Sequence, residues 1–127
     1  MFCGTGSDVG KSVIATAVCR IFKQDGMHPA PFKAQNMAPF YHLTADGKRV
    51  ARAQGVQAEA AGIELSTDMN PLLLIPTGEK SSEVIVEGES IGIKTAIQLY
   101  AEEDRNYLRS CIQKAYNRLA KQYDPIV

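Results

Sequence analysis

The chain has 127 residues, of which 45% are hydrophobic and 22% are charged. This length suits one domain of a soluble globular protein and is too short for two complete ones. Lys and Arg together number 14, as do Asp and Glu, so the net charge is zero, which argues against a nucleic-acid-binding protein. The sequence has no apolar stretch long enough for a membrane helix and no signal-peptide pattern, so we expect a cytoplasmic protein with no membrane partner.

The first part of the chain has the order strand, glycine-rich loop, helix. Residues 1–3 are a strand-like stub, residues 4–12 form the loop, and apolar side chains then recur at helical spacing. Gly26 predicts the end of this helix. Residues 30–33 are predicted to form a second short strand.

The middle of the chain is predicted to hold a loop, a helix, a strand and a hairpin. Residues 35–48 have a loop composition, and residues 49–61 are rich in Ala, Gln and Glu, which favour a helix. Residues 72–75 are a short apolar strand. Residues 83–87 alternate polar and apolar side chains and are followed by a turn at residues 88–90, which together predict a β-hairpin.

A long helical pattern follows the hairpin, and residues 124–127 resemble the start of another strand. One stripe of this helix is formed by Leu108, Cys111, Ile112, Ala115 and Leu119. Strands that alternate with helices predict an α/β domain. We therefore expect a mostly parallel sheet flanked by helices, as in P-loop NTPases, with the β-hairpin as an insertion.

The glycine-rich loop, Gly-Thr-Gly-Ser-Asp-Val-Gly-Lys-Ser, carries the clearest chemistry. Its glycines allow backbone N–H groups to point inward, and the N-terminus of the helix adds a partial positive charge. Lys11 can reach the β- and γ-phosphates of a nucleotide, and the Ser12 hydroxyl can bind Mg²⁺. Because Gly4 lies six residues before Gly10, the loop is one residue longer than the strict motif. It predicts a site for ATP and Mg²⁺; the alternative is a glycine turn with a solvated lysine.

The lengthened loop is similar to that of the dethiobiotin synthetase-like group of P-loop proteins. Within that group, further stretches resemble the cobyric acid synthase family. They are residues 30–38 (Ala-Pro-Phe-Lys-Ala-Gln-Asn-Met-Ala), 52–54, 57–62, 68–71 (Asp-Met-Asn-Pro), 76–78 and 84–86. The resemblance covers essentially the whole chain, and Phe-Lys-x-Gln-Asn-Met and Asp-Met-Asn-Pro are its most specific parts.

This resemblance implies ATP- and glutamine-dependent amidation of corrinoid side-chain carboxylates in cobalamin biosynthesis. The substrate would be adenosylcobyrinic acid a,c-diamide, and a synthetase domain would activate each carboxylate by phosphorylation. Ammonia would come from a C-terminal glutaminase domain. Residues 1–127 would be the N-terminal part of the synthetase domain, ending before an acidic segment that helps to hold Mg²⁺. We therefore expect an incomplete domain that is inactive alone.

The resemblance also implies a role for individual residues. The nucleotide would be held by Thr5, Gly6, Ser7, Asp8, Val9, Gly10, Lys11 and Ser12. Lys11, Lys33 and Asp8 would be catalytic, and Ser12 and Asp8 would bind Mg²⁺. The substrate would be oriented by Gln35, Asn36, Arg52 and Gln54.

Alternatives stay open for the residues and for the protein. Lys33 and Arg52 can instead be solvated surface charges, and Gln35 and Asn36 can be local turn residues. The protein can instead be a dethiobiotin synthetase-like ATP-dependent carboxylase, or a truncated module that binds nucleotide without catalysis. Unpaired sheet edges would also allow a homo-oligomer.

Overall fold

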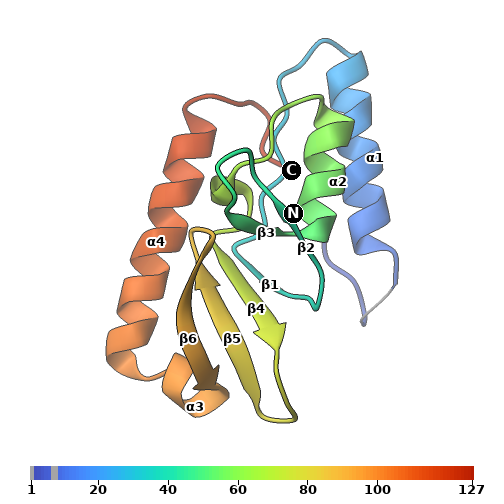
Figure 1. Cartoon of the computed structure of the whole chain (residues 1–127). Coiled ribbons are helices and arrows are strands. Elements are labelled where there is room, and N and C mark those ends of the chain that lie inside the picture. Colours follow the sequence, from blue (N-terminus) through green and yellow to red (C-terminus); the bar gives the residue numbers. More distant parts are fainter. Residues whose placement is uncertain (1, 7–8) are drawn as a thin grey trace.

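The computed structural model describes residues 2–6 and 9–127. The elements are α1 (Lys11–Gln24), β1 (Gln35–Met37), β2 (Tyr41–Leu43), β3 (Arg49–Ala51), α2 (Arg52–Ala61), the 3₁₀ helix η1 (Thr67–Met69), β4 (Leu72–Pro76), β5 (Ser81–Val86), β6 (Glu89–Thr95), α3 (Ala96–Leu99) and α4 (Glu102–Ala120). Helices α1 and α2 lie side by side, and α4 lies on the other side of the molecule (Figure 1). Within the described ranges, none of the helices combines the length and the apolarity needed to cross a membrane.

The main sheet has four strands in the order β1-β4-β5-β6. Strands β1 and β4 are parallel, whereas β4–β5 and β5–β6 are antiparallel. A separate antiparallel pair is formed by β2 and β3. The predicted α/β class with flanking helices is confirmed. The sheet is mixed because the inserted hairpin β5–β6, also predicted, adds antiparallel pairs to the parallel one.

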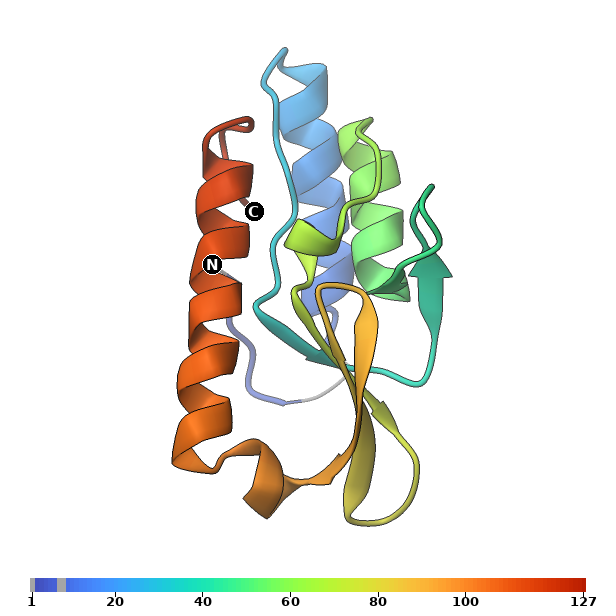
Figure 2. The ribbon, with the colours of Figure 1, turned by 60° about the vertical axis from the view of Figure 1, so that its left-hand side comes forward.

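The two faces of the sheet pack against different elements. One face packs against α3 and α4 in a cluster made of Leu72, Leu74, Val84, Val86, Leu99, Leu108 and Cys111. Leu73 and Ile85, which alternate with these residues along β4 and β5, face the other way and contact Ala51 of β3. Figure 2 shows α4 on one side of the hairpin and α2 on the other. The predicted apolar stripe of α4 is thus confirmed.

Helix α1 is confirmed and ends just before Gly26, but α2 begins three residues later than predicted. Residues 49–51 form β3 instead, and residues 35–48, predicted to be a loop, contain β1 and β2. The turn between β2 and β3 is closed by Thr44, whose N–H donates to the Lys48 carbonyl at 2.8 Å. At residues 49–51, helix propensity was overridden by the pairing of β2 with β3 and by the complete burial of Val50.

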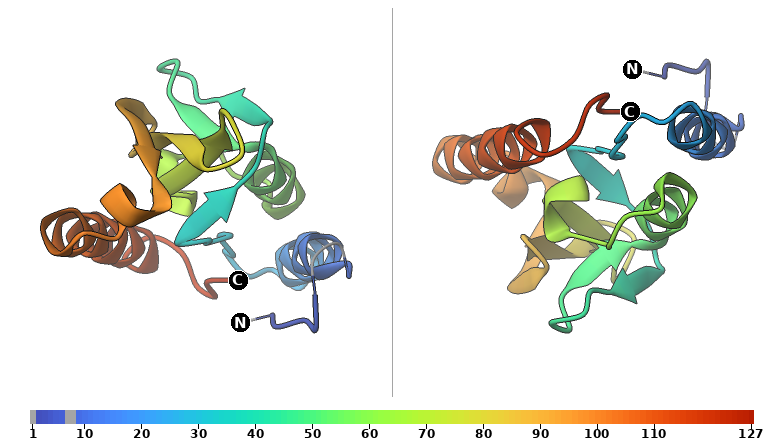
Figure 3. Two further views of the ribbon diagram at one scale, coloured as in Figure 1. Left: turned by 90° about the horizontal axis from the view of Figure 1, so that it is seen from below. Right: turned by 90° about the horizontal axis from the view of Figure 1, so that it is seen from above.

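The predicted strand at residues 30–33 is wrong: only Ala30 makes an isolated bridge, to Ile126. Pro29 and Pro31 have no backbone N–H, so this segment lacks two of the donors that a regular strand would offer. The Ala30 N–H donates to the carbonyl of Pro125 at 3.1 Å. Residues 124–127 therefore run beside this segment without forming a regular strand, and the chain end lies between α1 and α4 (Figure 3).

Candidate functional site

The phosphate loop leads directly into α1. Gly10 has φ 90° and ψ 5°, a left-handed conformation that glycine adopts without steric cost. Among the described residues, no side chain caps α1, and its first turn carries no acidic residue. The first-turn N–H groups are therefore available to an anion. Helix α4, by contrast, has Glu102, Glu103 and Asp104 in its first turn. The start of α1 thus fits a phosphate group.

Lys11 folds back over the loop, and its ammonium group donates a hydrogen bond to the Gly6 carbonyl. The loop also packs tightly at Gly4, where a Cβ would lie 2.7 Å from Val9 Cγ2 and 3.0 Å from Lys11 Cδ. A larger residue at Gly4 would therefore push the lysine stem away. Thr5 and Gly6 are exposed in the same loop.

Two adjoining cavities lie beside the start of α1. The smaller one, of about 430 Å³, is lined by Gly10, Lys11, Ser12, Val13, Lys33, Asn36 and Met37. The polar side chains that line the larger one, of about 570 Å³, include Lys11, Ser12, Lys33, Gln35, Gln54 and Gln57. Lys11, Ser12 and Lys33 belong to both cavities. The structure thus places three predicted site residues around one space, although they come from two separate segments.

Lys33 is positioned through its backbone. Its N–H donates to the Met69 carbonyl at 2.9 Å, and its own carbonyl accepts from Asn70 Nδ2 at 3.0 Å. Asn70 is 1% exposed, and it also donates to the Leu72 carbonyl and accepts from the Ala51 N–H. The Asp-Met-Asn-Pro stretch therefore fixes the segment that carries the exposed Lys33 side chain.

Asn36 and Gln54 belong to a buried chain of side-chain amides. Asn36 Nδ2 donates to Gln54 Oε1 at 3.0 Å, and Gln54 Nε2 donates to Gln57 Oε1 at 3.2 Å. Gln57 Nε2 donates to the Ser12 carbonyl at 3.3 Å. From the sequence we predicted no role for Gln57. The signal was its position three residues after Gln54, which places both side chains on one face of α2.

The remaining predicted residues have different positions. Gln35 lines the larger cavity, and its Nε2 donates to the Tyr100 hydroxyl at 3.1 Å. Arg52 is exposed at the first residue of α2 and lines neither cavity, so the structure does not bring it into the site. Ser7 and Asp8 lie outside the described residues, and their roles stay predictions.

The predicted Mg²⁺ site rests on Ser12 in this structure. Within residues 2–6 and 9–127, no group of three His, Cys, Asp or Glu side chains could hold a metal ion by itself. A single serine hydroxyl suits a magnesium ion that takes its other ligands from phosphate oxygens and water. Ser12 therefore fits a metal that arrives with a nucleotide.

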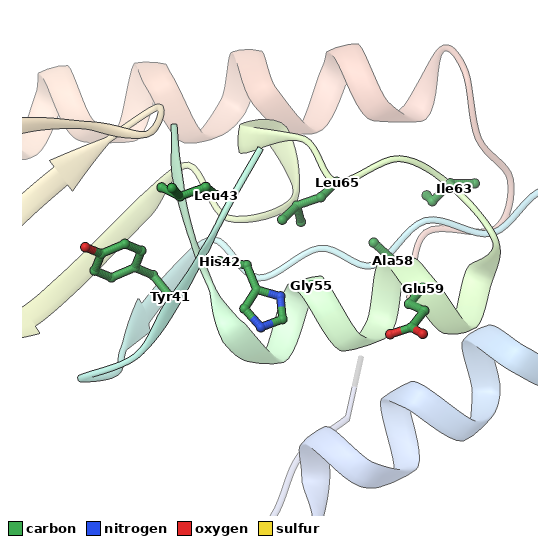
Figure 4. A pocket seen from close by; sticks show the side chains of 8 residues that line it. All are labelled: Tyr41, His42, Leu43, Gly55, Ala58, Glu59, Ile63 and Leu65. Carbon is green, nitrogen blue, oxygen red and sulfur yellow. The ribbon is translucent and has the colours of Figure 1, made fainter. Parts of the chain in front are cut away.

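A further hollow, of about 660 Å³, lies over α2 (Figure 4). It is lined by Tyr41, His42, Leu43, Gly55, Ala58, Glu59, Ile63 and Leu65. The His42 ring sits against Gly55, where a Cβ would lie 2.3 Å from His42 Nδ1. None of the predicted site residues lines this hollow, so it is separate from the two cavities at α1.

Residues 1–122 match the family described as the CobQ/CobB/MinD/ParA nucleotide-binding domain. The chain belongs to this family. Over all 127 residues it is 56% identical to a cobyric acid synthase of Phocaeicola vulgatus, 54% identical to one of Bacteroides fragilis and 49% identical to one of Salmonella gallinarum. No solved structure gave a match.

These comparisons confirm the predicted nucleotide-binding class and the resemblance to cobyric acid synthases. The chain spans about a quarter of the length of these relatives, 26%, 26% and 25% respectively. The family assignment therefore concerns the nucleotide-binding domain.

Proposed function

We propose that this chain supplies the ATP-binding part of a cobyric acid synthase-like amide ligase. The observation that carries the proposal is the meeting of Lys11, Ser12 and Lys33 around the two adjoining cavities at the start of α1. Membership of the nucleotide-binding family supports a nucleotide at the loop. The identity to cobyric acid synthases supports a corrinoid carboxylate as the second substrate.

In this proposal, the loop and the first turn of α1 hold the phosphates through backbone N–H groups. Lys11 exchanges its hydrogen bond to the Gly6 carbonyl for the β- and γ-phosphate oxygens. The Ser12 hydroxyl is a ligand for Mg²⁺, which neutralises charge on the transferring phosphoryl group. Lys33, on the facing segment, orients the incoming carboxylate and offsets its repulsion by the γ-phosphate.

The proposed chemistry has two steps. A carboxylate oxygen of the corrinoid attacks the γ-phosphorus, and ADP leaves. Ammonia then attacks the acyl carbon, phosphate leaves with the carboxylate oxygen, and a proton is lost to give the amide. Ammonia is supplied by a glutaminase domain of the longer protein. Because phosphoryl transfer depends mainly on positioning and electrostatics, the two lysines carry this role among the described residues, and Asp8 keeps its predicted role beside them.

Titration calorimetry with Mg-ATP tests the nucleotide site. We expect the native protein to bind and Lys11→Ala to weaken binding by about 30-fold, since losing a hydrogen bond to a charged group costs about 2 kcal/mol. Lys80→Ala is the matched control, because Lys80 is exposed in the loop before β5 and lines neither cavity. A native protein that does not bind Mg-ATP would contradict the proposal.

A second titration separates the candidate substrates. Adenosylcobyrinic acid a,c-diamide is expected to bind the nucleotide-loaded protein, and Lys33→Ala is expected to weaken that binding. Binding of diaminopelargonate in its place would favour the carboxylase alternative. Phosphate release with the corrinoid and ammonia distinguishes a catalytic chain from a module that only binds nucleotide.

A further inference from the structure

The first turn of α1 has little apolar packing of its own and receives a hydrogen bond from α2. In α1 only Cys19 is fully buried, and Val13 and Ile14 are 70% and 52% exposed. The Ser12 carbonyl accepts a hydrogen bond from Gln57 Nε2 across the α1–α2 contact at 3.3 Å, besides one from Thr16 Oγ1 within α1 at 2.8 Å. The helices lie side by side along this contact (Figures 1 and 2). Gln57 therefore provides a polar link between α2 and the phosphate-binding turn.

The hydrogen bond from Gln57 to the Ser12 carbonyl fixes the direction of the hydrogen bonds that link Gln57 to Gln54 and Gln54 to Asn36. A backbone carbonyl can only accept, so Gln57 must turn its NH₂ group toward Ser12. Its Oε1 then faces Gln54, which must donate through Nε2, and the Oε1 of Gln54 in turn accepts from Asn36. Gln57, Gln54 and Asn36 are 4%, 2% and 7% exposed, so water competes little with these hydrogen bonds. In such an environment, neighbouring hydrogen bonds polarise one another.

We propose that Asn36, Gln54 and Gln57 form an amide relay that positions the first turn of α1 from strand β1. This inference rests on the proposed nucleotide site and deepens it. Asn36 lies in β1, next to Gln35 and close to the segment that carries Lys33. The relay thus connects β1, near the segment of Lys33 that is assigned to the incoming carboxylate, with the helix assigned to the phosphates. Gln54 and Gln57 are positioning residues, whereas Lys11 and Ser12 contact the nucleotide.

Asn36→Asp should reverse the relay with almost no change in volume. A carboxylate only accepts, so Gln54 must rotate to offer Nε2 to residue 36. Gln54 then presents Oε1 to Gln57, Gln57 presents Oε1 to the Ser12 carbonyl, and the bond to α1 is lost. Lys11 and Lys33 line the cavity beside residue 36 and favour the ionised carboxylate. The variant is studied at mildly alkaline pH for the same reason.

The side-chain NH₂ signals of the ligand-free protein in a nitrogen–proton NMR spectrum test the relay directly. In Asn36→Asp, the Gln57 signal is expected to shift although residues 36 and 57 are not bonded to each other. The Gln113 signal is the internal control, because Gln113 bonds to Asn117 on the exposed face of α4. A Gln57 signal that keeps its native position would overturn the relay. If Asn36→Asp does not fold, Gln54→Glu serves, because its carboxylate only accepts and so makes Gln57 donate to residue 54 instead of Ser12.

Mg-ADP affinity tests the consequence for the nucleotide through a double-mutant cycle. Asn36→Asp and Gln57→Met are each expected to raise Kd about fivefold, the effect of one lost hydrogen bond. In the double variant, Asn36→Asp should add almost nothing, because the relay is already interrupted. Direct repulsion between residue 36 and the phosphates would give the same loss in both backgrounds and would overturn the proposal. If the native protein does not bind Mg-ADP, the proposed function fails, and the NMR experiment still decides the relay.

Discussion

The hairpin half and the phosphate half of the molecule are held together in different ways. The hairpin half (β4, β5, β6, α3 and α4) encloses one continuous apolar cluster. The phosphate half (residues 4–24) buries a single α1 side chain completely, that of Cys19, and burial raises the pKa of this thiol to about 11. Ile14 and Ile21 of the same helix are more than half exposed. Apolar packing therefore stabilises one half far more than the other.

Polar side chains replace apolar packing where the candidate site is formed. Asn70 holds the backbone of Lys33, and Gln57 holds the carbonyl of Ser12. Hydrogen bonds fix direction better than apolar contacts do, which suits groups that must meet a phosphate within a fraction of an ångström. The comparison implies that stability and nucleotide affinity should respond to substitutions in different halves of the chain.

The largest effect on stability is expected from Leu74→Ala in the hairpin half. Leu74 is 2% exposed within the main cluster, so truncation leaves a cavity and should lower the free energy of unfolding by about 3 kcal/mol. Urea denaturation measures the loss, and Leu43→Ala, at a residue that is 60% exposed, is the control. Mg-ADP affinity of the folded variant should equal that of the native protein. A parallel loss of affinity would show that the halves are not independent.

A smaller loss, of about 2 kcal/mol, is expected from Gly88→Ala in the hairpin turn, because it combines backbone strain with a collision. Gly88 has φ +87°, and a Cβ there would lie 2.5 Å from Lys48 Cβ and 2.8 Å from Thr67 Cγ2. Gly92→Ala isolates the strain, since Gly92 has φ +104° and a Cβ there would meet nothing within 4 Å. Thermal unfolding measures the loss of stability in both variants. Equal losses would mean that the collision is relieved without cost.

The elements that the sequence predicted well are those with local patterns. The helix after the loop, the hairpin and the stripe of α4 each follow from the periodicity of their own residues. Strand β1 was not predicted, because its three residues pair with β4, which lies more than thirty positions further along the chain. The predicted strand at residues 30–33 was wrong: Pro31 removes one backbone donor, and Ala30 alone forms a bridge, with Ile126.

The candidate site shows the same division. The glycine-rich loop identifies Lys11 and Ser12 from their neighbours in sequence, and Lys33 came from the family resemblance. Gln57 could be assigned only from a contact between α1 and α2, which no local pattern contains. Arg52 lies five residues before Gln57, at the exposed first residue of α2, so membership of the same helix did not separate the two.

The smallest effect is expected at the ion pair that joins the two sheets. Arg49 of β3 donates to both carboxylate oxygens of Glu83 of β5, at 3.1 Å each. These bonds, with a further one from Ser90, lower the pKa of the Glu83 carboxyl. A lowered pKa in the folded state stabilises the protein above the pKa of unfolded Glu, about 4.3, and this contribution is lost as the pH falls through the folded value.

Glu83→Gln should therefore cost about 1 kcal/mol near neutral pH, and its difference from the native protein should shrink under acidic conditions. Urea denaturation at a series of pH values measures this difference, with Glu79→Gln in the exposed loop before β5 as the control. Because β3 continues directly into α2, this pair is a polar connection between the hairpin half and the helix that carries Gln57. An unchanged Mg-ADP affinity in Glu83→Gln would show that the relay needs α2 only locally. If the native protein instead loses Mg-ADP affinity as Glu83 is protonated, the hairpin half helps to position the phosphate-binding turn.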